Sequence, residues 1–493
     1  MKIYTPSYYA RFRCLAGDCR DTCCRGWEID IDPDSYARYL AQPGKIGDRL
    51  RAAIDAQETP HFRLMGAEER CPFLNAQNLC DLYAELGRES LCQICARHPR
   101  YIEQYGDFAE MGVGLACEAA TRLVLLTRAP MRLSCADGPA PFADADAPDP
   151  AVCHALFTLR ARLFRLLQDR SIPLFGRLAQ ALTLCQTVQT RLERAASIEE
   201  FIDILAEAAK PTCTGLPGEM PAVSAAEASV GPVEAPGPAA CTADIFRTVQ
   251  ALIAAFSPAE PMEPEWRTLL DRAAADLAQA ETLPALAVLF QVDAGSPAAG
   301  DDLTALPLEA TLSPAAQDRV SADAPAAMQI VPDSSAPSPA FSFSAPELPG
   351  ADGLLPEVFF EQFAVYLVFR YFGKASFDGE VLLPMQLCAA SCALLRLLLT
   401  DELHRTGALS PDRACRIAQL FSKEVEYCPD NLDAILDAFE NEDALSPTNL
   451  RQLSRFFART GEIPRLTNGA GYVNVIVCKK VPEGEGKCIA VAA

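Results

Sequence analysis

The stretch Phe12–Asp32 reads FRCLAGDCRDTCCRGWEIDID and carries four cysteines within 21 residues. Further along, Cys71, Cys80, Cys92, Cys95 and Cys117 follow, so that nine of the twenty cysteines lie within the first 117 residues. Thiols gathered at this density serve as disulfides, as zinc ligands or as ligands of an iron–sulfur cluster. Which of these applies decides how the N-terminal part folds.

The length of the chain and its first residues argue against a disulfide framework. Such frameworks belong to short secreted domains, whereas this chain has 493 residues. Residues 1–17, MKIYTPSYYARFRCLAG, lack the apolar run and small-residue cleavage site of a secretory signal. We therefore expect a cytoplasmic protein whose clustered cysteines bind metal, in preference to disulfides or simply buried thiols.

The chain is strongly acidic, with 65 aspartates and glutamates against 43 lysines and arginines, a net charge of -22 and a pI near 4.7. Proteins that bind nucleic acid need a basic stripe to neutralise phosphates, and no such stripe is evident. Anionic membrane surfaces are disfavoured for the same electrostatic reason. We therefore expect neither nucleic acid nor a membrane as a partner.

Composition divides the chain into consecutive parts. The middle is rich in Ala, Pro, Ser, Asp and Glu, and such segments bury too little apolar surface to offset the entropy lost on ordering. We predict a cysteine-rich metal module at 1–125, a helical body at 126–212, a disordered Ala/Pro-rich insertion at 213–353 with a helical island at 242–280 that docks on the body, a C-terminal helical section at 354–465 and an atypical tail at 466–493.

Apolar residues recur at spacings of three and four along most of the remaining chain, which predicts helices and a mainly α fold. Ser197, followed by Glu200, is typical of a helix N-terminus. Residues 384–404 are apolar enough to suggest a membrane span, but Gln386, Arg396 and Asp401 interrupt them, and we predict a buried helix. Strand signals are confined to residues 27–32 and 471–481. The predicted helices are 151–169, 173–196, 198–209, 242–256, 264–280, 356–372 and 384–404.

The cysteine spacings suit metal binding. The Cys92-x2-Cys95 pair lets two thiolates converge on one ion, because a short turn holds their sulfurs together. In the Cys23–Cys24 doublet the side chains project in different directions, so either one cysteine packs while the other binds, or two sites share the doublet. Zinc and a cubane cluster each take four thiolates, so eight or nine cysteines suffice for two centres.

A longer pattern resembles a known family. It reads Phe12-x-Cys14-x4-Cys19-Arg-Asp-Thr-Cys23-Cys24-x-Gly26-Trp27-x-Ile29-Asp30-Ile31-Asp32, followed by Cys71-Pro-Phe-Leu74, Leu79-Cys80, Leu86-Gly87, Cys95-x3-Pro99-Arg100 and Cys117-Glu118. This pattern resembles the flagellin lysine-N-methylase (FliB) family, and its cysteines are similar to those of small zinc- or iron-chelating YkgJ-type proteins. The resemblance is tight over residues 1–125 and resumes more loosely over 355–440.

The resemblance implies a protein-lysine N-methyltransferase (EC 2.1.1) that methylates flagellin with S-adenosylmethionine and carries an iron–sulfur cluster of the 4Fe-4S type. It leaves Cys92 outside the ligand set. Zinc is the alternative metal, and the alternative function is a non-catalytic zinc- or iron-binding or redox protein that uses the same cysteines. The ligands implied by the resemblance are Cys14, Cys19, Cys23, Cys24, Cys71, Cys80, Cys95 and Cys117.

The sequence leaves the catalytic residues and the cofactor pocket unassigned. Methylation requires a neutral lysine amine, and the nearby candidates to accept its proton are Asp30, Asp32 and Tyr83, although Asp32-Pro33 equally suits a helix-entry turn. His98 is an alternative metal ligand, with a surface or capping role as the simpler interpretation. The Gly-x-Gly pairs at 112–114 and 469–471 are more typical of ordinary turns than of a cofactor site.

Overall fold

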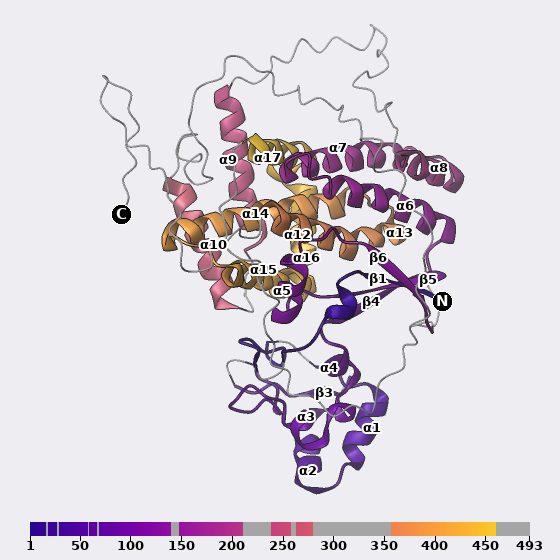
Figure 1. Cartoon of the computed structure of the whole chain (residues 1–493), viewed down its shortest axis with the longest axis vertical. Coiled ribbons are helices and arrows are strands. Elements are labelled where there is room, and N and C mark those ends of the chain that lie inside the picture. The colour runs from indigo at the N-terminus through magenta and orange to yellow at the C-terminus, as the bar shows by residue number, and fades with distance from the viewer. Residues whose placement is uncertain are drawn as a thin grey trace.

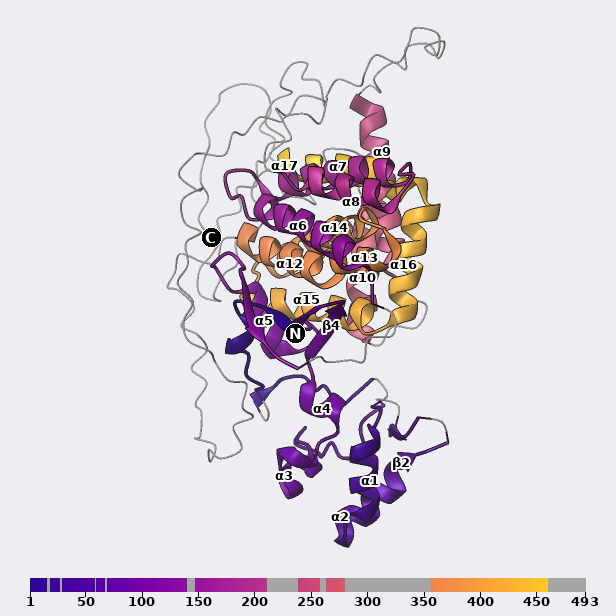
Figure 2. The same cartoon turned by 90° about the vertical axis from the view of Figure 1, so that its right-hand side faces the viewer.

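The computed structural model describes residues 1–15, 18–26, 29–57, 59–66, 69–139, 147–210, 238–257, 263–279 and 356–459. Stacked helices form a large body, and a smaller lobe built from residues 29–97 lies against one end of it (Figures 1 and 2). The mainly α fold predicted from the sequence is confirmed. The tail at 466–493, the strand predicted at 471–481 and most of the insertion at 213–353 lie outside the described residues.

The body consists of helices from both halves of the chain. The predicted helices of residues 151–209, 356–372 and 384–404 are confirmed, and Ser197 caps α8 by accepting a hydrogen bond from the Glu200 amide at 3.2 Å. The body helices are α5 Glu118–Leu125, α6 Pro150–Leu167, α7 Leu174–Leu192, α8 Ile198–Ala208, α12 Pro356–Tyr371, α13 Ala375–Asp378, α14 Leu383–Thr406, α15 Pro411–Glu426, α16 Pro429–Asn441 and α17 Pro447–Arg459. Short 3-10 turns lie at Tyr9–Arg11, Phe372–Lys374 and Asp443–Leu445 of the body and at Arg88–Ser90 of the small lobe.

Helix α14 lies at the centre of the body. Among the described helices it alone is long and apolar enough to cross a membrane by length and composition, yet 89% of its apolar window is buried inside the molecule. Its Arg396 donates a hydrogen bond to the Phe457 carbonyl at 3.0 Å, and burial lowers the pKa of Arg396 to about 10. The predicted buried helix is therefore confirmed.

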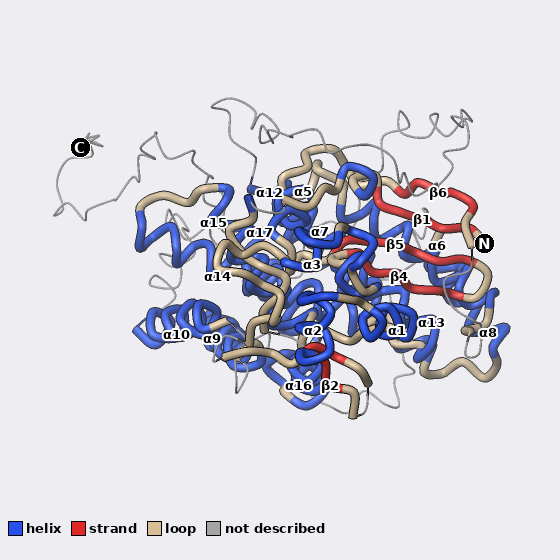
Figure 3. The backbone as a smooth tube through the Cα atoms, turned by 90° about the horizontal axis from the view of Figure 1, so that it is seen from below, coloured by secondary structure: helices blue, strands red, loops and turns tan. Residues whose placement is uncertain are grey.

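A four-stranded sheet is the main feature that the sequence did not predict. It contains β1 Lys2–Pro6, β4 Arg100–Tyr105, β5 Phe108–Val113 and β6 Leu133–Asp137 in the order β4-β5-β1-β6 (Figure 3). Strand β1 pairs in parallel with β5 and antiparallel with β6. Strand β5 is buried along nearly its whole length and β6 is exposed throughout, so neither shows the alternation typical of a half-buried strand.

The island docks on the body, as predicted. Its helices α9 Pro238–Ala255 and α10 Pro264–Gln279 pack against α14, α15 and α17. Trp266 is 0% exposed, and its indole N–H donates to the Phe256 carbonyl at 3.1 Å. A buried tryptophan with a satisfied N–H is a strong anchor, which explains why this segment is ordered within an otherwise Ala/Pro-rich stretch.

The small lobe contains α1 Pro33–Ala41, α2 Gly44–Ala53, α3 Asp81–Leu86, α4 Gln93–Arg97 and the short pair β2 Ile54–Asp55 and β3 His61–Phe62. The strand predicted at 27–32 is wrong in its described part, where Asp30 forms only an isolated bridge with His61. Asp32 instead caps α1, since its carboxylate accepts from the Ser35 amide at 3.0 Å. The helix-entry interpretation of Asp32-Pro33 is confirmed.

Candidate functional site

Five cysteines share the core of the small lobe. Cys71 and Cys92 are fully part of that core, and Cys24, Cys80 and Cys95 are partly buried against it. The Cys71 amide donates to the Cys24 carbonyl at 2.8 Å, which brings the first cysteine segment beside the second. Cys92, which the family resemblance leaves out, is 0% exposed and belongs to the same group. The fold therefore gathers thiols that are up to 71 positions apart in the chain.

A second group lies where the lobe joins the body. The Cys19 thiol lies 3.6 Å from Glu118, the neighbour of Cys117 at the start of α5. Burial, together with the nearby Cys14 and Cys23, raises the pKa of Cys117 to about 12. The nearby Cys23 also contributes electrostatically to raising the pKa of Cys71 and of Cys80. Cys23 thus lies between the two groups, and its neighbour Cys24 belongs to the lobe.

The side chains in these two groups are mainly thiols, which are chemically suited to bind a metal as thiolates. All cysteines in the described residues are free thiols. A hydrogen bond from Cys95 lowers the pKa of Cys92 to about 7, whereas the same contact and burial raise the pKa of Cys95. Within the described residues, however, no three Cys, His, Asp or Glu side chains converge as a metal site. The eight-cysteine ligand set therefore stays a prediction.

A cleft of about 480 Å³ opens beside the second cysteine group. One wall is the cysteine segment 20–25, and the opposite wall is the first half of α15. Glu118 and Thr121 of α5 and Arg70 and Asn78 of the small lobe also line the cleft. Pockets of this size accommodate small-molecule ligands. The cleft is therefore the candidate functional site.

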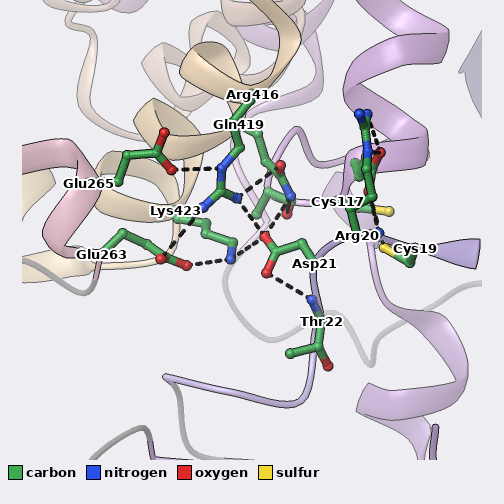
Figure 4. Close-up of polar contacts among 12 residues, drawn as sticks. Cys19, Arg20, Asp21, Thr22, Cys117, Glu263, Glu265, Arg416, Gln419 and Lys423 are labelled. Carbon is green, nitrogen blue, oxygen red and sulfur yellow. Dashed lines mark hydrogen bonds and ion pairs between the residues drawn. The ribbon is translucent and has the colours of Figure 1, made fainter. Parts of the chain in front are cut away.

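Ion pairs fix the walls of the cleft (Figure 4). The Asp21 carboxylate accepts from Arg416 at 2.8 Å and from Lys423 at 2.5 Å, and these cations lower its pKa despite its burial. Glu263, at the start of α10, contacts the same Lys423 at 2.6 Å and Arg25 at 3.1 Å. The island thus forms part of the site through its charges. The lowered pKa makes the Asp21 carboxylate a weak base, so it anchors the wall and does not accept protons.

The proton acceptors considered from the sequence lie elsewhere. Neither Asp30, Asp32 nor Tyr83 lines the cleft. Asp32 is engaged as a helix cap and also accepts from the Gln93 amide at 2.8 Å, and Tyr83 is exposed on α3. The residues that do line the cleft were missed because their charges come from segments far apart in the sequence, without a local motif.

The glycine pair 112–114 is not a turn. Gly112 lies in β5, where an added Cβ would meet the Tyr101 ring at 2.3 Å, and an added Cβ at Gly114 would lie 2.4 Å from the Tyr427 hydroxyl. These glycines let two partly buried tyrosines approach the strand closely. The ordinary-turn interpretation was wrong at this position, and the pair 469–471 lies outside the described residues.

His98 ends α4 as its C-terminal cap, which agrees with the capping interpretation. Burial, together with the charge of Lys423, lowers its pKa to about 4. Between about pH 6.5 and pH 4 the unfolded chain binds a proton that the folded chain does not, so the free energy of unfolding falls by about 3 kcal/mol as the pH drops through this window.

We expect His98→Gln to flatten this pH dependence in urea unfolding measured at several pH values. His154→Gln is the control, because the His154 side chain is 68% exposed. An equal slope in the wild type and in His98→Gln would contradict the assignment.

Comparison with known proteins identifies relatives of the chain. Residues 356–453 match the family model described as the FliB lysine N-methylase C-terminal domain. A lysine-N-methylase of Salmonella typhimurium is 29% identical over 138 residues, 27% of this chain and 34% of that protein, and the lysine-N-methylase of Salmonella choleraesuis is 28% identical over the same shares. The flagellar biosynthetic protein FliU of Salmonella muenchen is 27% identical over 129 residues, 25% of this chain and 76% of that protein.

The chain thus spans about a third of the length of the lysine-N-methylases that it matches. No solved structure matches it. The matched domain contains α12, α14, α15 and α16 and so supplies one wall of the cleft. Residues 356–453 are thus similar to the FliB C-terminal domain, and parts of the chain are similar to two lysine-N-methylases and to FliU.

Proposed function

We propose that the chain methylates lysine side chains of flagellin with S-adenosylmethionine, and that its N-terminal cysteines hold an iron–sulfur cluster. The observation that carries the proposal is the position of the cleft, which lies between the cysteine segment and the matched FliB domain. The names of the relatives, lysine-N-methylase and flagellar biosynthetic protein, support lysine methylation in a flagellar context.

In the proposed reaction the neutral lysine nitrogen attacks the methyl carbon of the donor. The new N–C bond forms as the C–S bond to the sulfonium breaks, and the bonding pair stays on sulfur as a neutral thioether. The methylated nitrogen then releases a proton to a base. At about 480 Å³ the cleft has room for a ligand of this class. The net charge of -22 favours the approach of a lysine-bearing protein loop.

The cluster would be held by the cysteines of the two groups. Cys24, Cys71, Cys80 and Cys95 share the lobe core, and this set of four matches the number that a 4Fe-4S cluster needs. When bound, the cluster supplies thiolate-held iron that staples a loop-rich lobe or offers an open iron site to a ligand. Cys14, Cys19, Cys23 and Cys117 gather at the edge of the cleft and form the second candidate set.

Mass spectrometry of flagellin tests the activity. We expect flagellin from cells that express this chain to carry lysines heavier by one or more methyl increments, and flagellin from cells lacking it to lose them entirely. Purified chain, flagellin and isotope-labelled S-adenosylmethionine are expected to reproduce the label on lysine. Unlabelled flagellin in both experiments would overturn the methyltransferase and favour a metal-binding or redox protein.

The cofactor is tested separately on protein purified without oxygen. Iron and acid-labile sulfide, with a broad absorption near about 400 nm, are expected for an iron–sulfur protein. Stoichiometric zinc in colourless protein would instead identify the alternative metal. The two experiments are independent, since a zinc protein that methylates flagellin would overturn only the cluster.

A further inference from the structure

Four polar residues of α15 lie on one face of that helix. Asp412, Arg416, Gln419 and Lys423 follow spacings of four, three and four, and residues at these spacings line one side of an α-helix. We call these four residues the α15 stripe. Such a stripe usually faces solvent, but Gln419 is only 3% exposed and the Lys423 side chain only 11%. The stripe therefore packs against protein at Gln419 and Lys423, whereas Asp412, with a side chain 41% exposed, lines the cleft.

The lower part of the stripe holds the first cysteine segment. Arg416, Gln419 and Lys423 all donate to one oxygen of Asp21, at 2.8, 3.0 and 2.5 Å respectively (Figure 4). Asp21 lies between Cys19 and Cys23 in the sequence. A partly buried carboxylate that accepts three hydrogen bonds, two of them from cations, is strongly fixed, so the segment that carries these cysteines is fixed with it.

The stripe also holds the second cysteine segment. The Gln419 amide donates to the Ala116 carbonyl at 2.9 Å, directly before Cys117. Asp412 accepts from Arg20 at 3.1 Å and pairs with Arg122 of α5. Gln419 therefore uses the two hydrogens of one side-chain nitrogen to connect Asp21 with Ala116, two positions that are 95 residues apart in the sequence.

We propose that the α15 stripe is the surface of the FliB C-terminal domain that positions the two cysteine segments, residues 18–25 and 115–118, side by side. The stripe residues act through Asp21, Arg20 and Ala116 and are positioning residues. Because segment 20–25 is also a wall of the cleft, the stripe sets the shape of the proposed active site. The contacts lie within the chain, so the inference holds whatever metal the cysteines bind and does not rest on the methyltransferase activity.

The test measures how fast individual cysteines react with a maleimide in the full-length protein, purified without oxygen and read by mass spectrometry. Gln419→Glu is nearly isosteric, but it faces Asp21 and the Ala116 carbonyl with an acceptor where a donor was. We expect Cys19 and Cys117 to react about tenfold faster in this variant, as expected for the loss of one or two hydrogen bonds to charged or buried groups. Exposed Cys135 and fully buried Cys185 report baseline reactivity and global unfolding in the same sample.

A second substitution provides the rescue. In Asp21→Asn with Gln419→Glu the donor and the acceptor are exchanged, and the negative charge now lies on residue 419, still beside Arg416 and Lys423. We expect Cys19 to regain its slow reaction, whereas Cys117 stays fast because the Ala116 carbonyl still lacks its donor. A merely destabilising role would not separate the two cysteines in this way.

Arg416→Met and Arg413→Met form a matched pair. Both arginines lie on α15, are 26% and 28% exposed, and pair with Glu265, but Arg413 otherwise pairs with Glu402 and makes no contact with the cysteine segment among the described ion pairs. Only Arg416→Met is expected to speed the reaction of Cys19. Equal rates in these two variants, or unchanged rates of Cys19 and Cys117 in Gln419→Glu while Cys185 stays protected, would overturn the proposal. If Cys185 reacts in Gln419→Glu, this variant is globally unfolded, and the comparison of Arg416→Met with Arg413→Met then decides whether the proposal holds.

Discussion

Replacing Cys71 with alanine is expected to remove most of the bound metal and to unfold the small lobe. Cys71 is buried in the lobe core, and its amide holds the Cys24 carbonyl at 2.8 Å. Lobes of this size bury little apolar surface, and in such modules the free energy of metal binding, on the order of 10 kcal/mol for structural zinc, is a large part of the folding free energy. We expect the same result for Cys24, Cys80 and Cys95.

Elemental analysis, sulfide assay and limited proteolysis of oxygen-free protein measure this effect. The metal content of Cys71→Ala should fall close to zero, and proteolysis should begin within residues 29–97. Cys135→Ser is the control, because Cys135 lies exposed on β6 at the far edge of the sheet; alanine at Cys213, Cys241 or Cys478 should also change little. Unchanged metal and unchanged proteolysis in all four lobe variants would show that these thiols only pack.

The helical part of the fold could be predicted from the sequence because helices produce a local periodicity of apolar residues. The Ser197 cap and the apolar spacing of residues 151–209 predicted α6, α7 and α8 to within a few residues. The island was predicted in the same way, since its apolar residues recur at helical spacing within a stretch of otherwise low complexity. Local patterns of this kind are reliable because they reflect one face of one element.

The sheet could not be predicted from the sequence because the order of its strands depends on contacts between distant segments. Strand β1 pairs with β5 across about a hundred residues, in the register Lys2 with Phe108. Strand β5 contains Glu110, Gly112 and Met111, a composition that does not suggest a strand. Its burial on both sides, and the glycines that admit Tyr101 and Tyr427, become visible only in three dimensions.

The cysteine groups and the cleft could be predicted from the sequence to different degrees. The family resemblance implied eight ligand cysteines without Cys92, and the fold gathers four of them, Cys24, Cys71, Cys80 and Cys95, in one core together with Cys92. The cleft depends on ion pairs such as that of Asp21 with Arg416, which are 395 positions apart. The sequence around a charged residue does not indicate which distant residue it pairs with. The sequence of α15 did contain one local signal, which is the spacing of four, three and four between the polar residues of the α15 stripe.

The second large effect is expected at the buried ion pair that joins the sheet to the helical body. Glu110 of β5 and Arg160 of α6 have side chains only 3% and 2% exposed, and Arg160 donates to both carboxylate oxygens, at 2.8 Å to one of them. Arg160 also stacks on Phe157 and donates to the Phe369 carbonyl of α12 at 3.3 Å. This pair fixes β5, the strand that leads to Cys117 and to helix α5, whose Glu118 and Thr121 line the cleft.

Glu110→Leu is expected to lower the free energy of unfolding by about 3–5 kcal/mol, because it leaves the Arg160 charge buried without its counterion. Arg160→Met should cost a similar amount by isolating Glu110. The double variant removes both charges, and apolar replacements of a buried pair are often nearly neutral, so it should be more stable than either single variant. Urea unfolding of the wild type and the three variants gives the coupling energy directly. If the two single losses simply added in the double variant, Glu110 and Arg160 would act as separate packing residues, and the attachment of the sheet would have to come from its apolar contacts with α6 and α12.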